Sequence, residues 1–183
     1  SDTSVSACLA EIARQTGGQI DVLVNNAGTG ILGAAEEVSA DEASRLFQIN
    51  LFGVMRMTSA VLPMMRARRS GTIINMSSSG GLASVPFAGL YCATKHALEA
   101  YTAALRHELW PLGVVATVVA PGPVSTPAGD SAARAATTIP DYANRRVRAD
   151  HLYTKAIRAG IDPIRVARTI LRIVRTRRPR PRY

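Results

Sequence analysis

Apolar runs and segments of helical periodicity alternate along this chain. Runs rich in β-branched residues, typical of strands buried on both faces of a parallel sheet, cover 20–24, 72–76 and 114–119. Apolar residues instead recur every three or four positions, which predicts amphipathic helices, over 5–15, 40–66 and about 91–110.

Two of the predicted helices have clear start signals. Ser39-Ala40-Asp41-Glu42 is a capping box, in which the serine accepts a bond from the first turn and the glutamate reaches back. Asp162 and Pro163 supply an N-cap and a first-turn proline for a C-terminal helix. The inner stripes predicted from the periodicity are Leu46, Ile49, Gly53, Met57, Ala60 and Met64 for the first helix, and Ile164, Ala167, Ile170, Leu171 and Val174 for the second.

The order of strands and helices predicts a three-layer α/β fold of Rossmann type, a doubly wound parallel sheet with helices on both faces. No second domain or internal repeat is evident, so residues 1–183 are interpreted as one domain. Ligands of such sheets bind beyond the carboxyl ends of the strands. Asn26, Ser78 and Pro121 each follow a predicted strand, so we expect them to converge on one cleft. Residues 125–144 are small, polar and weakly periodic, which favours a mobile loop over it.

The composition is that of an ordinary globular protein, with 47% hydrophobic and 19% charged residues among 183. The net charge of +9 is unevenly placed: residues 1–130 carry 8 basic and 10 acidic side chains, and residues 131–183 carry 14 and 3. The excess lies along a predicted helix and an arginine-rich tail that has no interleaved aromatic residue before Tyr183. This pattern favours a solvated surface over a nucleic-acid interface.

Three further features narrow the class. No apolar run reaches the ~20 residues that cross a bilayer, so we expect no membrane span and a cytoplasmic protein. Cys8 and Cys92 are too few for a disulfide framework and are expected to be reduced. His96, His107 and His151 lack ligand-like spacing, so no metal site is predicted.

The most informative stretch is Tyr91-Cys92-Ala93-Thr94-Lys95, which sets a phenol and an ammonium one helical turn apart, with Ser78 thirteen residues before the tyrosine. A lysine so placed favours the tyrosinate. We therefore expect the pKa of Tyr91 to fall from ~10 toward the range where a phenol exchanges protons at neutral pH. Such a pair suits a general acid/base, although the spacing by itself more often marks a solvated helix stripe.

Other motifs occur around this pair in a fixed order. They are Asp21-Val22-Leu23-Val24-Asn25-Asn26-Ala27-Gly28, Phe47-Gln48-Ile49-Asn50, Ile73-Ile74-Asn75-Met76-Ser77-Ser78 and Ala120-Pro121-Gly122-Pro123-Val124-Ser125-Thr126. With these motifs the chain resembles the short-chain dehydrogenase/reductase family over nearly its whole length. Residues 86–95 look most like the branch that includes hydroxysteroid and retinol dehydrogenases.

The resemblance implies an oxidoreductase that transfers a hydride between NAD or NADP and a secondary alcohol or ketone, a lipophilic steroid- or retinoid-like one by the branch. Tyr91 would exchange a proton with the alkoxide, and Lys95 would lower the Tyr91 pKa and bind the nicotinamide ribose. Ser78 would hold the substrate oxygen. Asn50 matches a proton-relay residue, the alternative being a satisfied core asparagine.

A set of cofactor contacts is implied as well. Asn26, Ala27 and Gly28 match the strand end where a small residue lets the dinucleotide approach closely, although Asn25 or Asn26 could merely tie adjacent strands together. The turn at Pro121 and Gly122 would lie under the nicotinamide, and Val124 and Thr126 would contact its carboxamide. The implied cofactor-binding residues are Asn26, Ala27, Gly28, Tyr91, Lys95, Pro121, Gly122, Val124 and Thr126.

One part of the family pattern is missing from this sequence. The family's T-G-x-x-x-G-x-G turn binds the pyrophosphate. The segment from Thr29 to Gly33 looks similar but is rejected as a substitute, because it follows the Asn-Asn-Ala-Gly strand rather than starting the fold. We therefore expect an N-terminally incomplete Rossmann domain, a fragment short of about 60 residues by the size of βαβ units, with weak or absent dinucleotide affinity. The 20–24 strand would then expose an apolar edge, and the C-terminus stops where the family continues into a final strand.

Several alternatives stay open at this stage. NADP is favoured over NAD, but the discriminating residue would follow a strand that the sequence lacks. Substrate identity is expected to depend on the variable loop 127–160. The family often pairs subunits through the helices after Asn50 and around Tyr91, which predicts a homo-oligomer. The alternative function is a catalytically silent remnant that serves as a binding or assembly module, against which the retention of Asn50, Ser78, Tyr91 and Lys95 argues.

Overall fold

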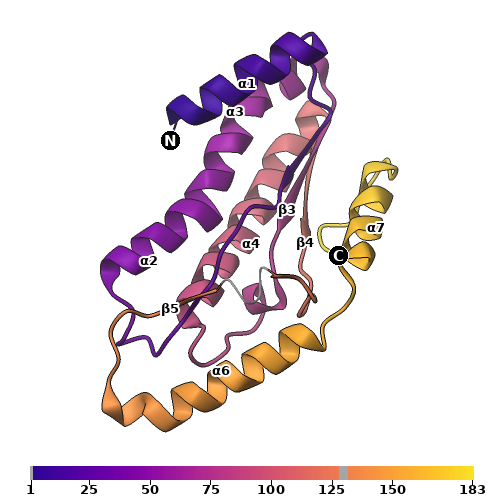
Figure 1. Cartoon of the computed structure of the whole chain (residues 1–183). Coiled ribbons are helices and arrows are strands. Elements are labelled where there is room, and N and C mark those ends of the chain that lie inside the picture. The colour runs from indigo at the N-terminus through magenta and orange to yellow at the C-terminus, as the bar shows by residue number, and fades with distance from the viewer. Residues whose placement is uncertain (1, 128–131) are drawn as a thin grey trace.

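The computed structural model describes residues 2–127 and 132–183, and Figure 1 shows their arrangement. The helices are α1 (Asp2–Thr16), α2 (Ala40–Phe47), α3 (Gly53–Arg68), α4 (Gly89–Leu109), α6 (Ala143–Arg158) and α7 (Pro163–Val174). The strands are β1 (Val22–Asn25), β2 (Ile31–Leu32), β3 (Gly71–Met76), β4 (Val114–Val119) and β5 (Ala133–Arg134). Shorter helical turns are η1 (Gln48–Phe52), η2 (Ser79–Gly81), η3 (Trp110–Leu112) and η4 (Pro140–Tyr142).

The main sheet is parallel, with β3 between β1 and β4. Val24 lies opposite Ile74, which lies opposite Thr117, so the carboxyl ends of the strands meet at one edge. Helices α1, α3 and α4 lie on one side of the sheet and α7 on the other (Figure 1). The predicted three-layer Rossmann-type fold is therefore confirmed.

Each face of the sheet has its own apolar core. The core under α3 and α4 consists of Val61, Met65, Ile73, Leu105, Leu109, Val114 and Ala116, and the core under α7 of Ile74, Met76, Val119 and Ile173. Ile73 and Ile74 are neighbours in sequence yet belong to different cores, because successive strand residues point to opposite faces. Burial on both faces explains why these strands read as continuous apolar runs.

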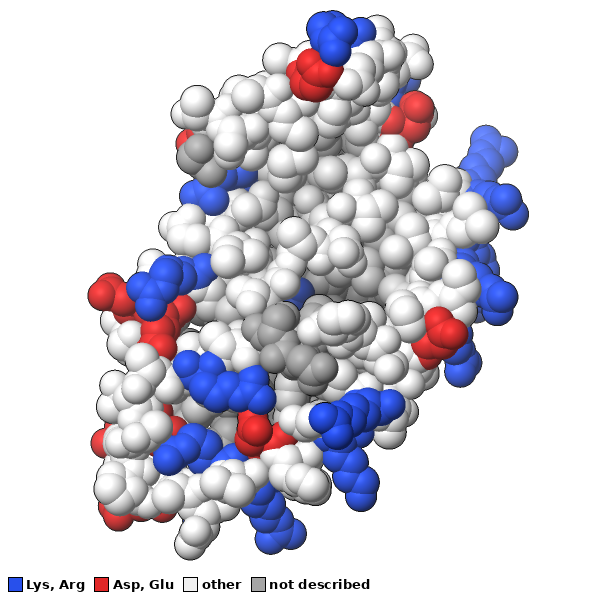
Figure 2. Space-filling model, in the orientation of Figure 1, with Lys and Arg blue, Asp and Glu red and all other residues white. Residues whose placement is uncertain are grey.

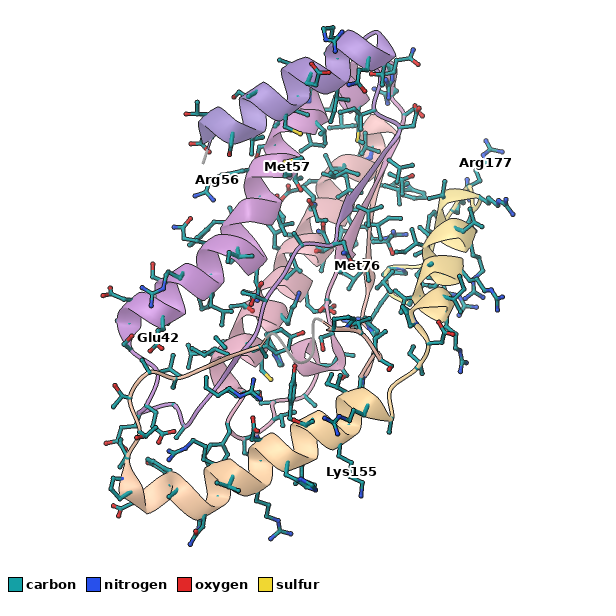
Figure 3. All side chains as sticks on the ribbon, viewed as in Figure 1. Glu42, Arg56, Met57, Met76, Lys155 and Arg177 are labelled. Carbon is teal, nitrogen blue, oxygen red and sulfur yellow. The ribbon has the colours of Figure 1, made fainter. Side chains whose placement is uncertain are left out.

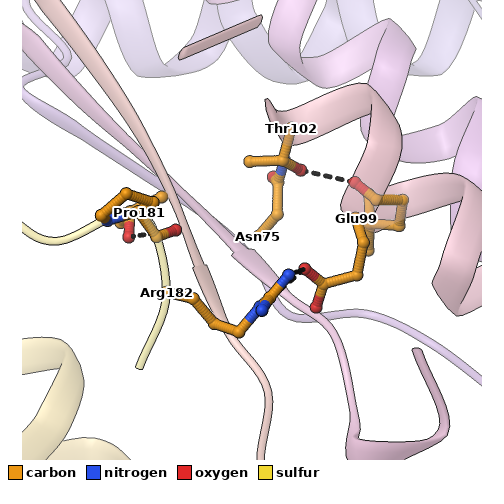
Figure 4. Close-up of polar contacts among 7 residues, drawn as sticks. Asn75, Glu99, Thr102, Pro181 and Arg182 are labelled. Atoms are coloured by element: carbon orange, nitrogen blue, oxygen red, sulfur yellow. Dashed lines mark hydrogen bonds and ion pairs between the residues drawn. The ribbon is translucent and has the colours of Figure 1, made fainter. Parts of the chain in front are cut away.

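The C-terminal residues extend this sheet beyond β4. The Val118 amide donates to the carbonyl of Pro181 at 3.1 Å, and the Tyr183 amide donates to the carbonyl of Val118 at 3.0 Å. Arg182 also reaches from this segment to Glu99 on α4, with its Nε 3.0 Å from the carboxylate (Figure 4). Arg182 forms an isolated parallel bridge with Val118, so these last residues continue the sheet beside β4 without forming a strand of their own.

At the opposite side of the sheet, β1 is an edge strand among the described residues. Val24 is 36% exposed, and Val22 and Leu23 are only half-buried. The sequence-based prediction of an apolar edge facing solvent agrees with this arrangement.

The helical segment after the capping box departs from its predicted phase. The box itself is confirmed, since the Glu42 amide donates to Ser39 Oγ and the Ser39 amide to Glu42 Oε2. The π-helical turn η1 then inserts one extra residue between α2 and α3. The buried stripe therefore moves on by one position after Leu46 and consists of Leu46, Asn50, Val54, Thr58, Val61 and Met65.

The C-terminal half holds two further corrections. Residues 143–158, placed by the sequence in a variable loop, form helix α6. In α7 the Asp162 cap is confirmed, but Ile173 is buried while Ile164 and Leu171 are 48% and 47% exposed. Of the predicted inner residues, Ile170 does pack against the core, together with Val166 and Ile173, so the face that meets the sheet overlaps the predicted stripe only in part.

Basic side chains gather over α6 and α7, along the lower part and the right side of the view in Figure 2. This distribution matches the charge excess of the last third of the sequence. None of the helices in residues 2–127 and 132–183 is both long and apolar enough to span a bilayer.

Candidate active site

The loops that follow β3 and β4 are tied together at the carboxyl edge of the sheet. The Ser77 amide donates to the carbonyl of Val119, and the Ser79 amide donates to the carbonyl of Pro121, each at 2.8 Å. The segments after β3 and β4 are therefore held side by side. This brings Ser78 and Pro121 to the same edge, as the sequence predicts.

Tyr91 and Lys95 reach this edge from the first turns of α4. Lys95 Nζ lies 5.8 Å from the centroid of the Tyr91 ring and donates to the carbonyl of Met76, at the end of β3, at 2.8 Å. The hydroxyl of Ser78 is a side-chain hydrogen-bond partner of the Tyr91 phenol. A Cβ on Gly80 would lie 3.3 Å from Tyr91 Cε1, so a residue without a side chain allows this approach. Ser78, Tyr91 and Lys95 thus form one cluster.

Burial governs the protonation of this pair. Burial raises the pKa of the Tyr91 phenol above its ordinary value, and the hydrogen bond from Ser78 opposes that rise only in part. Burial also lowers the pKa of the Lys95 ammonium to about 8. The expectation that Lys95 lowers the pKa of Tyr91 is therefore wrong for this structure. Burial is the largest cause of the rise, and the charge of Lys95 is not among its causes, so the phenol keeps its proton at neutral pH.

Asn50 lies in the π-helical turn and is 1% exposed. Its amide oxygen accepts from the Thr29 backbone amide and its amide nitrogen donates to the Thr29 carbonyl, both at 2.9 Å. The same nitrogen donates to Thr94 Oγ1 at 3.1 Å, and Thr94 in turn donates to the carbonyl of Tyr91 at 2.7 Å. Asn50 is therefore satisfied within the fold, and it fastens the segment after β1 to the helix that carries Tyr91.

At the end of β1 the structure distinguishes the residue that ties adjacent strands together from those that could contact a cofactor. Asn25 is buried, and its side-chain amide donates to the Asn75 side chain at 2.8 Å, so Asn25 is the residue that ties adjacent strands together. Asn26, Ala27 and Gly28 are exposed beside it. A Cβ on Gly28 would lie 3.5 Å from Lys95 Nζ and 3.3 Å from the amide oxygen of Asn50. The Gly28 backbone thus approaches the cluster closely.

The turn after β4 leads toward α7. The Ile161 amide donates to the carbonyl of Pro123, and the Ser125 amide donates to the carbonyl of Ile161, both at 3.0 Å, which holds Val124 against the start of α7. Pro121 borders an open cavity of about 580 Å³ on this side of the sheet. The cavity is lined by Val119, Ala120, Pro121, Ile161, Arg165, Val166, Arg168, Thr169, Arg172 and Tyr183. Gly122 and Thr126 lie in the same turn, and their contacts with a cofactor stay predictions.

Sequence reasoning missed four contributors to the site. Thr29 and Thr94 connect Asn50 to the Tyr91 helix, and their only sequence signal is position, since Thr94 lies between Tyr91 and Lys95 and Thr29 directly follows Gly28. The Met76 carbonyl receives the Lys95 ammonium, and a backbone acceptor leaves no trace in sequence. Tyr153, on α6, packs against the cluster around Tyr91, and it lies in the segment that was expected to be a loop.

The fold and this cluster first define a class: Rossmann-type α/β proteins with a half-buried tyrosine, a buried lysine and a serine beyond the carboxyl ends of parallel strands. The family model described as short chain dehydrogenase matches residues 1–136. The chain therefore belongs to the short-chain dehydrogenase family.

Individual relatives agree with this family. The chain is 40% identical to the 3-ketodihydrosphingosine reductase of Bacteroides thetaiotaomicron over 88% of its own length and 61% of the relative's. It is 43% identical to retinol dehydrogenase 8 of Bos taurus over 69% of this chain and 39% of that one. The chain thus spans less than two thirds of the length of these relatives.

Solved structures show the same relationship. A short-chain dehydrogenase from Streptomyces avermitilis superposes with a TM-score of 0.87 at 33% identity, covering 100% of this chain and 66% of that one. A short-chain dehydrogenase/reductase from Burkholderia phymatum in complex with NAD gives a TM-score of 0.85 at 28% identity, with 100% and 67% covered. The chain is therefore partial relative to both solved structures.

Proposed function

We propose that this protein interconverts a secondary alcohol and a ketone by hydride transfer with a nicotinamide dinucleotide, with Tyr91 as the general acid/base. The observation that carries the proposal is the cluster in which the half-buried Ser78 hydroxyl meets the Tyr91 phenol while the buried Lys95 ammonium lies 5.8 Å from the same ring. A carbonyl oxygen within reach of both hydroxyls would be polarised and aligned for protonation.

The residues present fit the nicotinamide end of such a cofactor, which supplies the hydride or accepts it when bound. The exposed backbone at Asn26 to Gly28 offers a surface free of bulky side chains next to the Lys95 ammonium. Lys95 and the turn at Pro121 would hold this part of the cofactor. These 183 residues contain no Gly-rich turn of the family type for the pyrophosphate, so the affinity of this chain taken alone would be weak.

Each catalytic side chain then has a distinct task. Tyr91 is protonated at neutral pH, as a phenol ordinarily is, and burial raises its pKa further, so it suits the donation of a proton to the alkoxide that forms as a ketone is reduced. Lys95, with a pKa of about 8, can change its protonation state near neutral pH and can return a proton toward the phenol. Ser78 fixes the substrate oxygen beside Tyr91. Asn50 holds the scaffold rather than the reacting oxygen, because its hydrogen bonds go to Thr29 and Thr94.

Two observations support a lipophilic substrate. The side chains around Tyr91 on the α6 side are apolar, namely Leu32, Ala88 and Cys92. The relatives named above include a 3-ketodihydrosphingosine reductase and a retinol dehydrogenase. We extend the proposal to a ketone on an apolar framework.

Pairing of subunits through the helices after Asn50 belongs to the same proposal. Ile49, Phe52 and Met55 are 46%, 39% and 37% exposed, and they follow one another at three-residue spacing along η1 and α3. An apolar stripe of this kind on a helix surface favours contact with a second copy. Sedimentation at graded concentrations, with Phe52→Glu as the disrupting variant, measures whether copies associate.

The reaction class is tested by isotope transfer. The protein, as its source encodes it, is incubated with NADPH or NADH deuterated at the transferred position and with 2-decalone. Deuterium on the carbinol carbon of the product is expected, and Ser78→Ala should slow the transfer roughly 100-fold. A product without deuterium, or one formed equally fast by Ser78→Ala, would refute the proposal.

A further inference from the structure

The amino edge of the main sheet lies at the opposite end of the strands from the candidate active site (Figure 1). The chain enters β1, β3 and β4 there through residues 17–21, 66–71 and 106–113. Residues 175–180 follow α7 and lead to the C-terminal residues that continue the sheet beside β4. Parallel strands begin at the same edge, so these four segments form one surface, which we call the arginine edge.

Arginine supplies most of the charge of this surface. The four segments carry eight arginines and two acidic residues, namely Arg66, Arg68, Arg69, Arg106, Arg175, Arg177, Arg178 and Arg180 against Asp21 and Glu108. Among the ion pairs of residues 2–127 and 132–183, one involves the arginine edge, and it joins Arg68 to Asp21. The other guanidinium groups of the edge have no acidic partner within that part of the chain. The edge therefore carries a positive potential that attracts anionic partners.

Hydrogen bonds hold the arginine edge together around Trp110. Arg69 donates to the carbonyl of Pro111 at 2.6 Å, and Arg106 donates to the carbonyl of Pro179 at 2.8 Å, so three of the four segments are joined directly. The Arg106 guanidinium also lies 5.6 Å from the centroid of the Trp110 ring. A hollow of about 200 Å³ at this place is lined by Trp110, Gly113, Val115, Arg177 and Arg178.

Trp110 is the residue of the arginine edge that suits contact with lipid. It is the only tryptophan of the sequence, and it is 45% exposed. Tryptophan combines an apolar ring with one N–H donor, and it is enriched where proteins meet the boundary between water and lipid. Arg177 projects outward past the end of α7 (Figure 3). An exposed aromatic ring thus lies among cations that reach into solvent.

We propose that the arginine edge is a docking surface for a membrane whose lipid headgroups carry negative charge. The guanidinium groups would bind lipid phosphates, because their planar set of N–H donors matches phosphate oxygens. Trp110 would enter the boundary between the headgroups and the acyl chains. This inference does not depend on the proposed reaction, since Ser78 and Tyr91 lie at the other edge of the sheet.

The shape of the arginine edge favours a lipid surface over a nucleic acid. Proteins that read duplex DNA place a helix or a strand in a groove, whereas α3, α4 and α7 only end at this edge and turns form most of it. Proteins that bind single strands stack successive bases on several aromatic side chains, and Trp110 is the one aromatic residue of the four segments. Docking on anionic lipid needs only clustered positive charge and a side chain that enters the interface.

Sedimentation with vesicles tests this surface directly. The protein, as its source encodes it, is mixed with vesicles of phosphatidylcholine alone or of an equal mixture of phosphatidylcholine and phosphatidylglycerol. Binding to the mixed vesicles and not to the neutral ones is expected, and it should weaken as salt is added because salt screens the charges. One variant that carries both Arg177→Gln and Arg178→Gln should lower the partition coefficient about 30-fold, the scale for two arginines close to an anionic surface.

Helix α6 offers a matched control for this variant. Arg145 and Arg148 are exposed on α6, at the other end of the molecule from the arginine edge (Figure 1). The variant with Arg145→Gln and Arg148→Gln removes the same charge, and it should bind the mixed vesicles within about twofold of the wild type, because charges beyond a Debye length of the surface are screened. None of the four substituted arginines forms an ion pair with the described residues, so both variants should fold, which circular dichroism checks.

Tryptophan fluorescence supplies the second readout, and the signal that Trp110→Phe loses is assigned to Trp110. A blue shift of this signal on addition of mixed vesicles is expected, because the ring leaves water. The inference is overturned if the mixed vesicles do not bind, if neutral vesicles bind equally well, or if the emission of Trp110 does not move. It is also overturned if the α6 variant loses as much binding as the variant at Arg177 and Arg178. Binding of duplex DNA without binding of vesicles would overturn it in favour of a nucleic acid.

Discussion

Replacing Lys95 with methionine should raise stability while it removes activity. Lys95 is 5% exposed, and burial lowers the pKa of its ammonium from 10.5 to about 8. At neutral pH the folded protein must hold this charge away from water, whereas the unfolded chain keeps it hydrated. Methionine has a similar length and no charge, so it can fill the same space. The substitution thus separates the electrostatic cost of Lys95 from its packing.

The magnitude follows from the two pKa values. A difference of about 2.5 corresponds to about 3 kcal/mol at neutral pH. Between pH 8 and 10.5 the unfolded chain binds a proton that the folded protein lacks, so wild-type stability rises with pH and the penalty shrinks to about 1 kcal/mol near pH 10. The bond from Lys95 to the Met76 carbonyl offsets about 1 kcal/mol. Lys95→Met should therefore be more stable by about 2 kcal/mol at pH 7 and about equal near pH 10.

Urea unfolding at pH 7 and pH 10, followed by circular dichroism, measures both values. Lys155→Met, on the solvent side of α6, is the matched control and should change the free energy of unfolding by less than about 0.5 kcal/mol (Figure 3). A loss of stability in Lys95→Met at pH 7 would contradict the reasoning. So would a difference from the wild type that is the same at both pH values.

Three further substitutions test other contacts. Gly28→Ala should lower kcat/KM about 10-fold with little loss of stability, because its Cβ would press on Asn50 at 3.3 Å; unchanged kinetics would show that this approach is unimportant. Arg182→Gln should lower the free energy of unfolding by about 1–2 kcal/mol, because it strips a buried carboxylate, Glu99, of its cation; a neutral result in thermal melts would argue against the C-terminal pairing. Gly113→Ala should lower the free energy of unfolding by about 2–4 kcal/mol, because φ is +78° and a backbone carbonyl occupies the Cβ position. Urea unfolding measures this loss, and an unchanged free energy of unfolding would disprove the strain.

The main sheet could be predicted because its strands are buried on both faces and follow one another in the order of the chain. β4 has the predicted bounds, 114–119, and the capping box at Ser39 is present as expected. Helix α6 could not be predicted in this way. Its partly buried residues include the charged Arg146 and Asp150, whereas the apolar Val147 and Leu152 are exposed, so burial and apolar character do not coincide along the helix.

The positions of the site residues were predictable to a larger extent than their chemistry. Ser78, Tyr91 and Lys95 converge because two of them share a helix face and the third follows a strand that ends beside that helix. The direction of the Tyr91 pKa shift was wrong, because sequence spacing reveals the neighbouring charge and not the depth of burial. The phase of the stripe around Asn50 was wrong because a π-helical turn adds a residue without any signal in the periodicity.

Deuteride transfer to 2-decalone by Tyr91→Phe is the most direct test of the central claim. Tyr101→Phe is the matched control, since Tyr101 lies on the same helix and its pKa is also raised by burial. The account predicts that Tyr91→Phe loses activity at least about 100-fold while Tyr101→Phe keeps it, with both variants folded by circular dichroism. Transfer by Tyr91→Phe at the rate of the wild type would contradict it.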